Sequence, residues 1–177
     1  MNLKKYLPFE NYTLATRLTV DEACMRITDN VYIKREFRFL VFTNKTDKPY
    51  EGTITGNCFT ISRLINYRNS FLPIIKGDID TFAGQTHIKI KMRLPVAVLI
   101  FMAVWLSIMG LVALVMTLML IAKLIRHSPS DLSPMSIIPF VMLFFGGALC
   151  YFAFNKERKI AKTFLQDLFE AEEIAAQ

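Results

Sequence analysis

The fold of this chain is decided by the stretch Leu94–Ala122, LPVAVLIFMAVWLSIMGLVALVMTLMLIA, which carries no charge and lies between Arg93 and Lys123. A membrane-spanning helix needs about 20 apolar residues. This stretch is longer, and at about 1.5 Å per residue it makes a helix of roughly 44 Å. We therefore expect a spanning helix that tilts, or whose last turns rise beyond the hydrocarbon. The alternative is a core helix of a soluble protein, which at this length would carry a charged face.

A second apolar run, Pro134–Phe154, follows after a short polar loop. Ser133 and Pro134 suit the N-cap and the first turn of a helix. Pro139 removes one backbone donor, so we expect a mild kink near the loop. The two runs together predict a membrane hairpin.

Lysine and arginine near the spans predict the orientation of the hairpin, because they accumulate on the cytoplasmic side. The loop contributes Lys123 and Arg126, beside His127. More cations flank the outer ends of the hairpin: Lys89, Lys91, Arg93, Lys156, Arg158, Lys159 and Lys162. We expect a two-pass protein with both termini in the cytoplasm.

Small residues near the middle of each span predict where the two helices cross, since small side chains let helix backbones approach closely in lipid. They are Ser107 and Gly110 in the first span, and Gly146 and Gly147 in the second. The alternative is that these residues only tolerate lipid. Neither span contains an ionisable Asp, Glu, Lys, Arg or His, which argues against a self-contained transporter.

The net charge of +6 falls entirely before the first span. On a membrane protein such charge predicts attraction to anionic lipid. Nucleic-acid binding is not expected, because no binding motif accompanies the charge. Cys24, Cys58 and Cys150 have no metal-binding spacing, and free cysteines agree with a reducing compartment. The N-terminus lacks the apolar run of a signal peptide.

The segment 1–93 predicts a small α+β domain. Thr19 and Glu22 form a capping box that opens a helix to about Asn30. A short strand at 12–18 precedes this helix, and an antiparallel meander of about five strands follows it. The predicted meander strands are Glu36–Phe42, Tyr50–Thr55, Cys58–Leu64, Phe71–Asp80 and Gln85–Arg93, with a tight turn at Gly56-Asn57.

The segment 155–177 predicts a helix that continues the second span. Its apolar residues recur at helical spacing: Ile160, Phe164, Leu165, Leu168 and Phe169. Such a stripe needs a covering surface, and the bare face of the meander is the simplest one. The fold class is then an antiparallel meander with one N-terminal and one C-terminal helix, interrupted by a transmembrane hairpin at 94–154. Alternatively, the C-terminal helix lies on the membrane or pairs with another chain.

Catalytic chemistry is not predicted. The two histidines, His87 and His127, have no recognisable acid, base or metal-ligand partners in the sequence. Gly52–Gly56 lies in a hairpin, so it is not a phosphate loop. We expect no enzyme activity, no metal and no cofactor.

Two surfaces are candidates for binding. The first is the outward face of the last strand, with His87, Lys89, Lys91 and Arg93, which would meet lipid headgroups. Its alternative role is ordinary topology signalling. The second is the polar run Tyr67, Arg68 and Asn69, which could hold an anionic ligand or a partner. More often, the asparagines of such a loop bond their own backbone.

A resemblance supports this architecture. The residues that carry it are Tyr50-Glu51-Gly52, Gly56, Phe59-Thr60-Ile61, Tyr67-Arg68-Asn69-Ser70-Phe71-Leu72-Pro73, Gly77, Arg93, Phe101 and Trp105. From about residue 12 onward the chain resembles an uncharacterised bacterial family of small two-span membrane proteins. The resemblance implies the bacterial inner membrane and brings no activity with it.

The sequence therefore supports two hypotheses. The first is a non-enzymatic two-span membrane protein whose cytoplasmic module binds a partner protein, a lipid or a small ligand at the membrane surface. The second is an oligomeric effector that perturbs the membrane or forms a pore, gated by the cytoplasmic domain. Membrane lipid, a protein partner and a second copy of the chain are the expected partners.

Overall fold

A computed structural model of the chain describes residues 9–33, 48–65, 69–125 and 134–174. The chain is mixed α+β, with a seven-stranded, mostly antiparallel sheet and three helices, two of them long and apolar. It divides into two compact units. The sheet unit comprises Met1–Pro95 and Phe154–Gln177, and the hairpin unit comprises Val96–Ala153.

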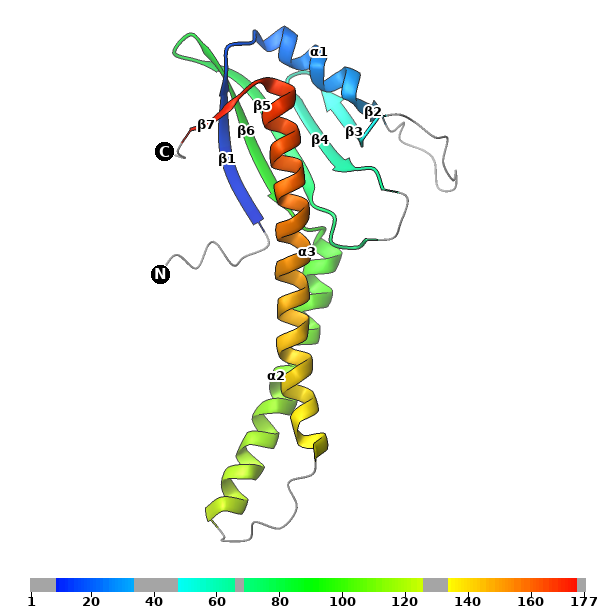
Figure 1. Cartoon of the computed structure of the whole chain (residues 1–177), viewed down its shortest axis with the longest axis vertical. Coiled ribbons are helices and arrows are strands. Elements are labelled where there is room, and N and C mark those ends of the chain that lie inside the picture. The colour runs from blue at the N-terminus through cyan, green and yellow to red at the C-terminus, as the bar shows by residue number, and fades with distance from the viewer. Residues whose placement is uncertain (1–8, 34–47, 66–68, 126–133, 175–177) are drawn as a thin grey trace. The chain divides into compact units, whose positions relative to one another are not determined.

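The sheet unit holds all seven strands, in the order β2-β3-β4-β5-β6-β1-β7 (Figure 1). Every neighbouring pair is antiparallel except β2 and β3, which are parallel. The elements of this unit before the hairpin are β1 (Phe9–Thr16), α1 (Val20–Asn30), β2 (Val31–Ile33), β3 (Tyr50–Thr55), β4 (Cys58–Arg63), β5 (Ile74–Phe82) and β6 (Gln85–Arg93). After the hairpin, α3 (Ile138–Phe169) enters the unit at Phe154 and is followed by β7 (Glu172–Ile174).

Local signals in the sequence predicted several of these elements correctly. The capping box is confirmed, with the Thr19 side chain accepting from the Glu22 backbone and the Glu22 carboxylate accepting from the Thr19 backbone. The tight turn between β3 and β4 is confirmed, and Gly56 adopts a positive φ of 56° there. The predicted bounds of β3 and β6 match the structure.

Other predictions were wrong. β1 begins at Phe9 and ends at Thr16, not at 12–18, and β5 runs Ile74–Phe82, not Phe71–Asp80. The short strands β2 and β7 were missed, so the sheet is larger than the predicted meander. Both have three residues, and only their pairing with β3 and β1 makes them strands. The predicted strand Glu36–Phe42 lies outside the described residues.

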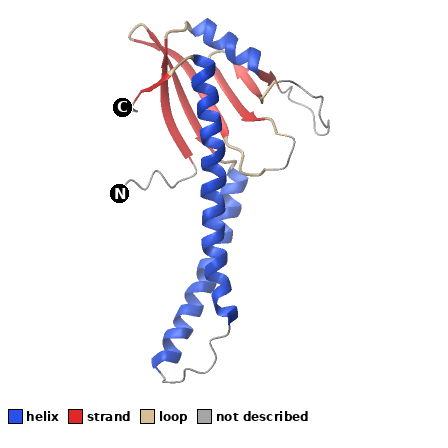
Figure 2. Cartoon of the chain, viewed as in Figure 1, coloured by secondary structure: helices blue, strands red, loops and turns tan. Residues whose placement is uncertain are grey.

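The helices α1 and α3 cover one face of the sheet (Figure 2). Strand residues therefore alternate between buried and open positions, as an antiparallel sheet with one covered face requires. The fully buried large side chains of the sheet unit are Leu14, Ile27, Tyr50, Phe59, Ile61, Ile75, Ile79, Ile88, Ile90, Met92, Leu94 and Phe169. In α1 the buried face is Ala23 and Ile27, and Cys24 lies beside it, half-buried.

The C-terminal part of α3 packs directly on the sheet. The Phe164 ring stacks on Tyr50 at 4.2 Å between centroids, and Phe169 lies 6.2 Å from Phe59. Leu165 between them is completely buried. Of the apolar stripe predicted for this segment, Leu165 and Phe169 are buried and Phe164 stacks on the sheet, while Ile160 is exposed.

Ion pairs hold α3 on both sides of this stripe. Toward β4, the Arg63 guanidinium lies 2.8 Å from the Glu157 carboxylate. Toward β1 and β7, Lys162 lies 2.5 Å from Glu173, and Arg158 lies 3.3 Å from Glu10. The ion pair with β4 and the ion pairs with β1 and β7 lie on opposite sides of the helix, so together they restrict its rotation about its axis.

The end of α3 was predicted at the C-terminus but occurs at Phe169, because the next residue reverses the chain. Glu170 has φ of 47°, and the backbone N–H of Ala171 donates to the carbonyl of Gln166 at 3.0 Å. This is a Schellman closure with glutamate in the position that glycine usually fills. Arg26 of α1 stabilises it by donating to the Leu168 carbonyl at 3.0 Å and pairing with Glu170.

Replacing Arg26 with alanine should lower the free energy of unfolding by about 1 to 2 kcal/mol, because a charged hydrogen bond to a helix-end carbonyl is lost. Urea denaturation of the full chain in mild detergent, followed by circular dichroism, measures this change. The matched control is Glu170→Gln, which keeps the Leu168 bond and removes only an exposed ion pair, so its cost should stay below about 0.5 kcal/mol. Equal costs for the two variants would contradict the capping role.

The hairpin unit consists of α2 (Val96–Ile125), a short 3-10 helix (Pro134–Ile137) and the first part of α3. Both long helices are long and apolar enough to cross a membrane. Their most apolar stretches are largely exposed, unlike the core helices of a soluble protein. The two helices indicate a two-pass membrane protein.

Two details of the hairpin differ from prediction. Leu94 was counted with the first span but is fully buried and belongs to the sheet unit, so α2 begins only after Pro95. Pro139 was expected to kink the second helix. It lies in the first turn of α3, where its missing N–H has no helical acceptor to lose.

Candidate functional site

The open face of the sheet is the face that α1 and α3 leave uncovered. On β6 it carries Lys89, Lys91 and Arg93, all exposed, and His87, half-buried. The alternate residues Ile88, Ile90 and Met92 are buried beneath α3 and α1, as the sequence predicted. The predicted cations of β6 therefore lie on the open face of the sheet.

The strand register arranges the open face in rows that cross the sheet. Counted from the β6 end that leads into α2, the first row is Phe9, Arg93 and Ile74, and the second is Asn11, Lys91, Lys76 and Thr60. The third row is Thr13, Lys89, Asp78 and Cys58, and the fourth is Ala15, His87 and Asp80. Across β1, β6, β5 and β4, the charged residues of the first two rows are all cations, the third row pairs Lys89 with Asp78, and the fourth carries Asp80. Glu51 lies farther across the sheet, on β3 opposite Ser62.

Lys89 of the third row and His87 of the fourth row each contact another residue of the open face. Lys89 lies 3.8 Å from Asp80, with both side chains more than half exposed. The His87 ring lies 5.5 Å from the ring of Phe82. Lys89 and His87, two of the four residues predicted to meet lipid headgroups, thus contact other residues of the open face.

The cations of the first two rows form what we term the cation cluster: Lys76, Lys91 and Arg93. All are exposed, and none makes an ion pair or hydrogen bond with another described residue. Lys76 lies directly opposite Lys91 across the β5–β6 pair. Like charges in such positions repel, so the cluster is a concentrated, uncompensated positive site. Sequence reasoning missed Lys76, since its place beside Lys91 depends on register.

The exposed cysteine of the open face is not an activated nucleophile. The Cys58 thiol donates to the Asp78 carboxylate at 3.5 Å. This hydrogen bond, together with the negative charge of Asp78, raises the pKa of Cys58 above its ordinary value. Burial likewise raises the pKa of Cys24. Both groups therefore favour the thiol, which is the unreactive form.

The second predicted surface is only partly described. Tyr67 and Arg68 lie outside the described residues. The side-chain oxygen of Asn69 accepts from the backbone N–H of Phe71 at 3.0 Å, which is the local turn geometry that asparagine commonly adopts.

The four small residues of the spans differ in their surroundings. A Cβ added at Gly146 would lie 3.4 Å from the Trp105 indole nitrogen, and one at Gly110 would lie 4.0 Å from Leu143. These two glycines therefore face the other helix of the hairpin. Ser107 is exposed, and no atom lies within 4 Å of a Cβ added at Gly147.

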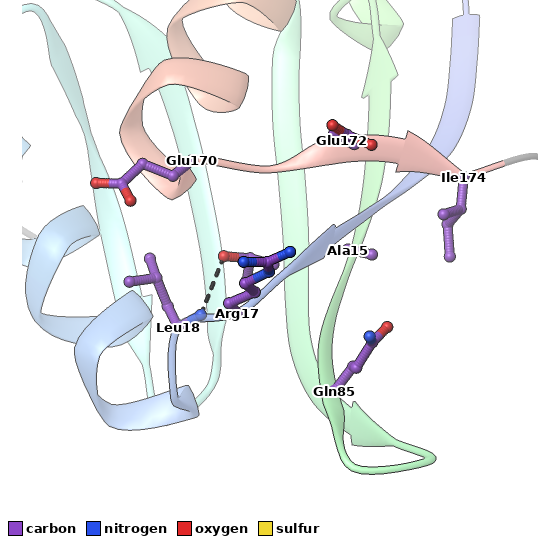
Figure 3. A pocket seen from close by; sticks show the side chains of 8 residues that line it. Ala15, Arg17, Leu18, Gln85, Glu170, Glu172 and Ile174 are labelled. Carbon is purple, nitrogen blue, oxygen red and sulfur yellow. Dashed lines mark hydrogen bonds between the residues drawn. The ribbon is translucent and has the colours of Figure 1, made fainter.

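A hollow of about 540 Å³ lies at the other end of β6 from Arg93 (Figure 3). It is lined by Ala15, Thr16, Arg17, Leu18, Gln85, Glu170, Glu172 and Ile174. The Leu18 backbone N–H donates to the Thr16 hydroxyl at 3.2 Å at its edge. One carboxylate, Glu170, is already paired with Arg26. The hollow thus lies on the rim of the sheet unit, outside the packed core beneath α3.

Within the described parts of the chain, no three His, Cys, Asp or Glu side chains are grouped as a metal site would require. What the geometry offers is an electrostatic surface: two rows of uncompensated cations on an open sheet, next in sequence to a long apolar helix.

Comparison with known proteins adds no family to this description. No protein-family model, no curated protein and no solved structure matches the chain.

Proposed function

We propose that this chain is a non-enzymatic two-pass protein of a bacterial inner membrane, with both termini in the cytoplasm. Residues 1–93 and 155–177 form one cytoplasmic domain, and the hairpin at 94–154 interrupts it. This domain is a binding module that works at the membrane surface through the open face of its sheet.

The grouping of the two chain ends supports the orientation. Met1–Pro95 and Phe154–Gln177 form one compact unit, which requires both ends of the hairpin to emerge on the same side of the membrane. The cations that flank the hairpin are more numerous at those ends than in the loop. Both observations favour a cytoplasmic domain.

The single observation that carries the binding role is the cation cluster. Lys76, Lys91 and Arg93 lie side by side on exposed strand positions without an acidic partner among the described residues. A sheet that needed these positions only for solubility would mix charges, as its third and fourth rows do. The packed contact of Leu165 and Phe169 with the sheet further favours an external binding surface over an internal pocket.

Thiol labelling tests the orientation and the accessibility of the open face together. In a Cys24→Ser, Cys150→Ala background, a membrane-impermeant maleimide should label Cys58 in inverted membrane vesicles and leave it unlabelled in intact spheroplasts. Cys58 is the probe because it is exposed on the third row of the open face, and labelling is carried out at mildly alkaline pH because its raised pKa disfavours the reactive thiolate. A cysteine introduced at Ser128 in the loop, in a chain in which Cys58 is also replaced with serine, is the matched control and should show the reverse pattern. Labelling of Cys58 in spheroplasts would refute the proposal.

Ion leakage separates the binding module from a pore-forming effector. Proteoliposomes that contain the purified chain and are loaded with potassium should retain their gradient as well as protein-free liposomes do. Neither span carries an Asp, Glu, Lys, Arg or His side chain with which to line a polar pore. Leakage that rises steeply with the protein-to-lipid ratio would instead support the oligomeric effector.

A further inference from the structure

We propose that Lys76, Lys91 and Arg93 form a binding site for the phosphate of an anionic phospholipid headgroup. The inference rests on the proposed function, in which the domain works at the membrane surface, and it names the ligand of that surface. The site joins two strands, because Lys76 lies on β5 while Lys91 and Arg93 lie on β6.

The spacing of the three side chains suits one phosphate group. Directly opposed residues such as Lys76 and Lys91 have Cβ atoms about 5 Å apart, and diagonal neighbours such as Lys76 and Arg93 are about 7 to 8 Å apart. A lysine or arginine side chain is long enough to reach the midpoint between two such positions, where a phosphate would lie. Two ammonium groups and a guanidinium fork can therefore converge on the oxygens of one phosphate.

Neighbouring residues complete the polar surroundings of this site. Asn11 lies opposite Lys91 on β1, and Thr60 lies opposite Lys76 on β4, so an amide and a hydroxyl flank the two lysines in the same row. The nearest acids, Asp78 and Asp80, lie in rows farther from the span, and Asp80 is paired with Lys89. Asp78 is two residues from Lys76 on β5 and accepts a hydrogen bond from the Cys58 thiol. Three cations stand beside this one carboxylate, so the cluster stays positive.

The first row favours a lipid over free phosphate. Arg93 lies between Phe9 and Ile74, and Phe9 is 42% exposed. An exposed apolar ring beside a cation suits the boundary where headgroups meet acyl chains, because the ring can contact hydrocarbon while the cation contacts phosphate. Only Leu94 and Pro95 separate Arg93 from the first residue of α2. The chain itself therefore keeps this row within a few residues of the apolar segment.

A second copy of the chain is a poor occupant of the same face. Two copies in one membrane are related by an axis along the membrane normal, so equivalent residues lie at equal depth. A face-to-face pair would then place one cation cluster against the other, and such like-charge contact disfavours association. An anionic headgroup meets the same surface with opposite charge.

Short-chain lipids that stay dissolved in detergent test the site on the full-length protein. Binding of dioctanoyl-phosphatidylglycerol and dioctanoyl-phosphatidylcholine is measured by titration against the purified chain in a neutral detergent. We expect clear preference for phosphatidylglycerol, and an affinity that falls as salt is raised. Lys76→Gln should weaken phosphatidylglycerol binding about fivefold, as expected for the loss of one cation near a phosphate. Lys76→Arg should retain it.

Lys89→Gln is the matched control, because Lys89 lies on the same open face but is paired with Asp80. Its binding should stay within about twofold of the parent chain. Lys76 is the decisive position, since it is far from the span in sequence and its replacement leaves the flanking topology signals intact. Circular dichroism confirms that the exposed variants remain folded.

Three results would overturn the inference. The first is equal affinity for the two lipids, and the second is an equal loss of affinity in Lys76→Gln and Lys89→Gln. The third is that inorganic phosphate displaces the bound lipid at a concentration no higher than that of the phosphatidylglycerol. The last would assign the site to free phosphate. The thiol-labelling pattern of Cys58 is independent of all three. If Cys58 is labelled only in inverted vesicles but the protein shows no preference for phosphatidylglycerol, the phosphate site is refuted. The cytoplasmic placement of the open face is then still supported.

Discussion

Replacing Gly52 with alanine should lower the free energy of unfolding of the sheet unit by about 3 kcal/mol. Gly52 of β3 lies opposite Ile61 of β4. A Cβ at this position would press into the carbonyl oxygen of Thr60 and lie 2.8 Å from the Cα of Ile61. Both contacts are with backbone, so no side-chain rotation relieves them and the two strands must separate. Urea denaturation in mild detergent measures the loss.

Thr53→Ala and Gly56→Ala are the controls for this prediction. Thr53 is the exposed neighbour of Gly52 on the same strand, so its replacement reports only strand propensity. Gly56 has a positive φ and open space around its Cα, so alanine there costs about 1 kcal/mol of backbone strain without a clash. If Gly52→Ala is no more destabilising than Gly56→Ala, the close approach of β3 and β4 is refuted.

Arg63→Ala is expected to cost about 3 kcal/mol, because it leaves a buried carboxylate without its partner. Glu157 of α3 is 3% exposed, and its carboxylate lies 2.8 Å from the guanidinium of Arg63. Tyr50 shares this environment, where burial raises its pKa to about 12; the positive charge of Arg63 lowers that pKa and Glu157 raises it. Without Arg63, the buried charge of Glu157 would either draw water into the core or move the helix away from the sheet. The same urea denaturation detects either outcome.

A mutant cycle isolates the contribution of this pair. Glu157→Gln leaves the Arg63 side chain, which is 30% exposed and reaches water, so it should cost less than Arg63→Ala. The double variant Arg63→Leu, Glu157→Leu should recover most of the stability, since apolar residues of similar volume often replace a buried ion pair without loss. In the cycle built from Arg63→Ala, Glu157→Gln and the combination of these two, additive costs would show that the pair does not act as a unit.

Local chemistry explains which parts of the fold could be predicted from sequence. The capping box of α1 and the Gly56-Asn57 turn are formed by residues within a few positions of one another. The alternation of β6 is equally local, and each of its buried residues is apolar or Thr86. Such patterns need no knowledge of the rest of the chain.

Long-range pairing explains what could not be predicted. β7 exists because Glu172–Ile174 meets β1, and the helix ends before it at a glutamate held by Arg26, without the glycine that usually marks such an end. The cation cluster has the same origin. Lys91 and Arg93 could be assigned to an open face by alternation alone, but Lys76 joins them only through the register of β5 on β6.

The discontinuity of the sheet unit has a consequence for biosynthesis. The residues that cover the sheet, Leu165 and Phe169 of α3, are translated after the whole hairpin unit, Val96–Ala153. While the hairpin is being inserted, Tyr50 and Phe59 still lack the rings that stack on them in the finished unit. Maturation of the domain is therefore coupled to membrane insertion: a chain whose hairpin fails to insert correctly keeps an apolar sheet face exposed, which marks it for chaperones and proteases.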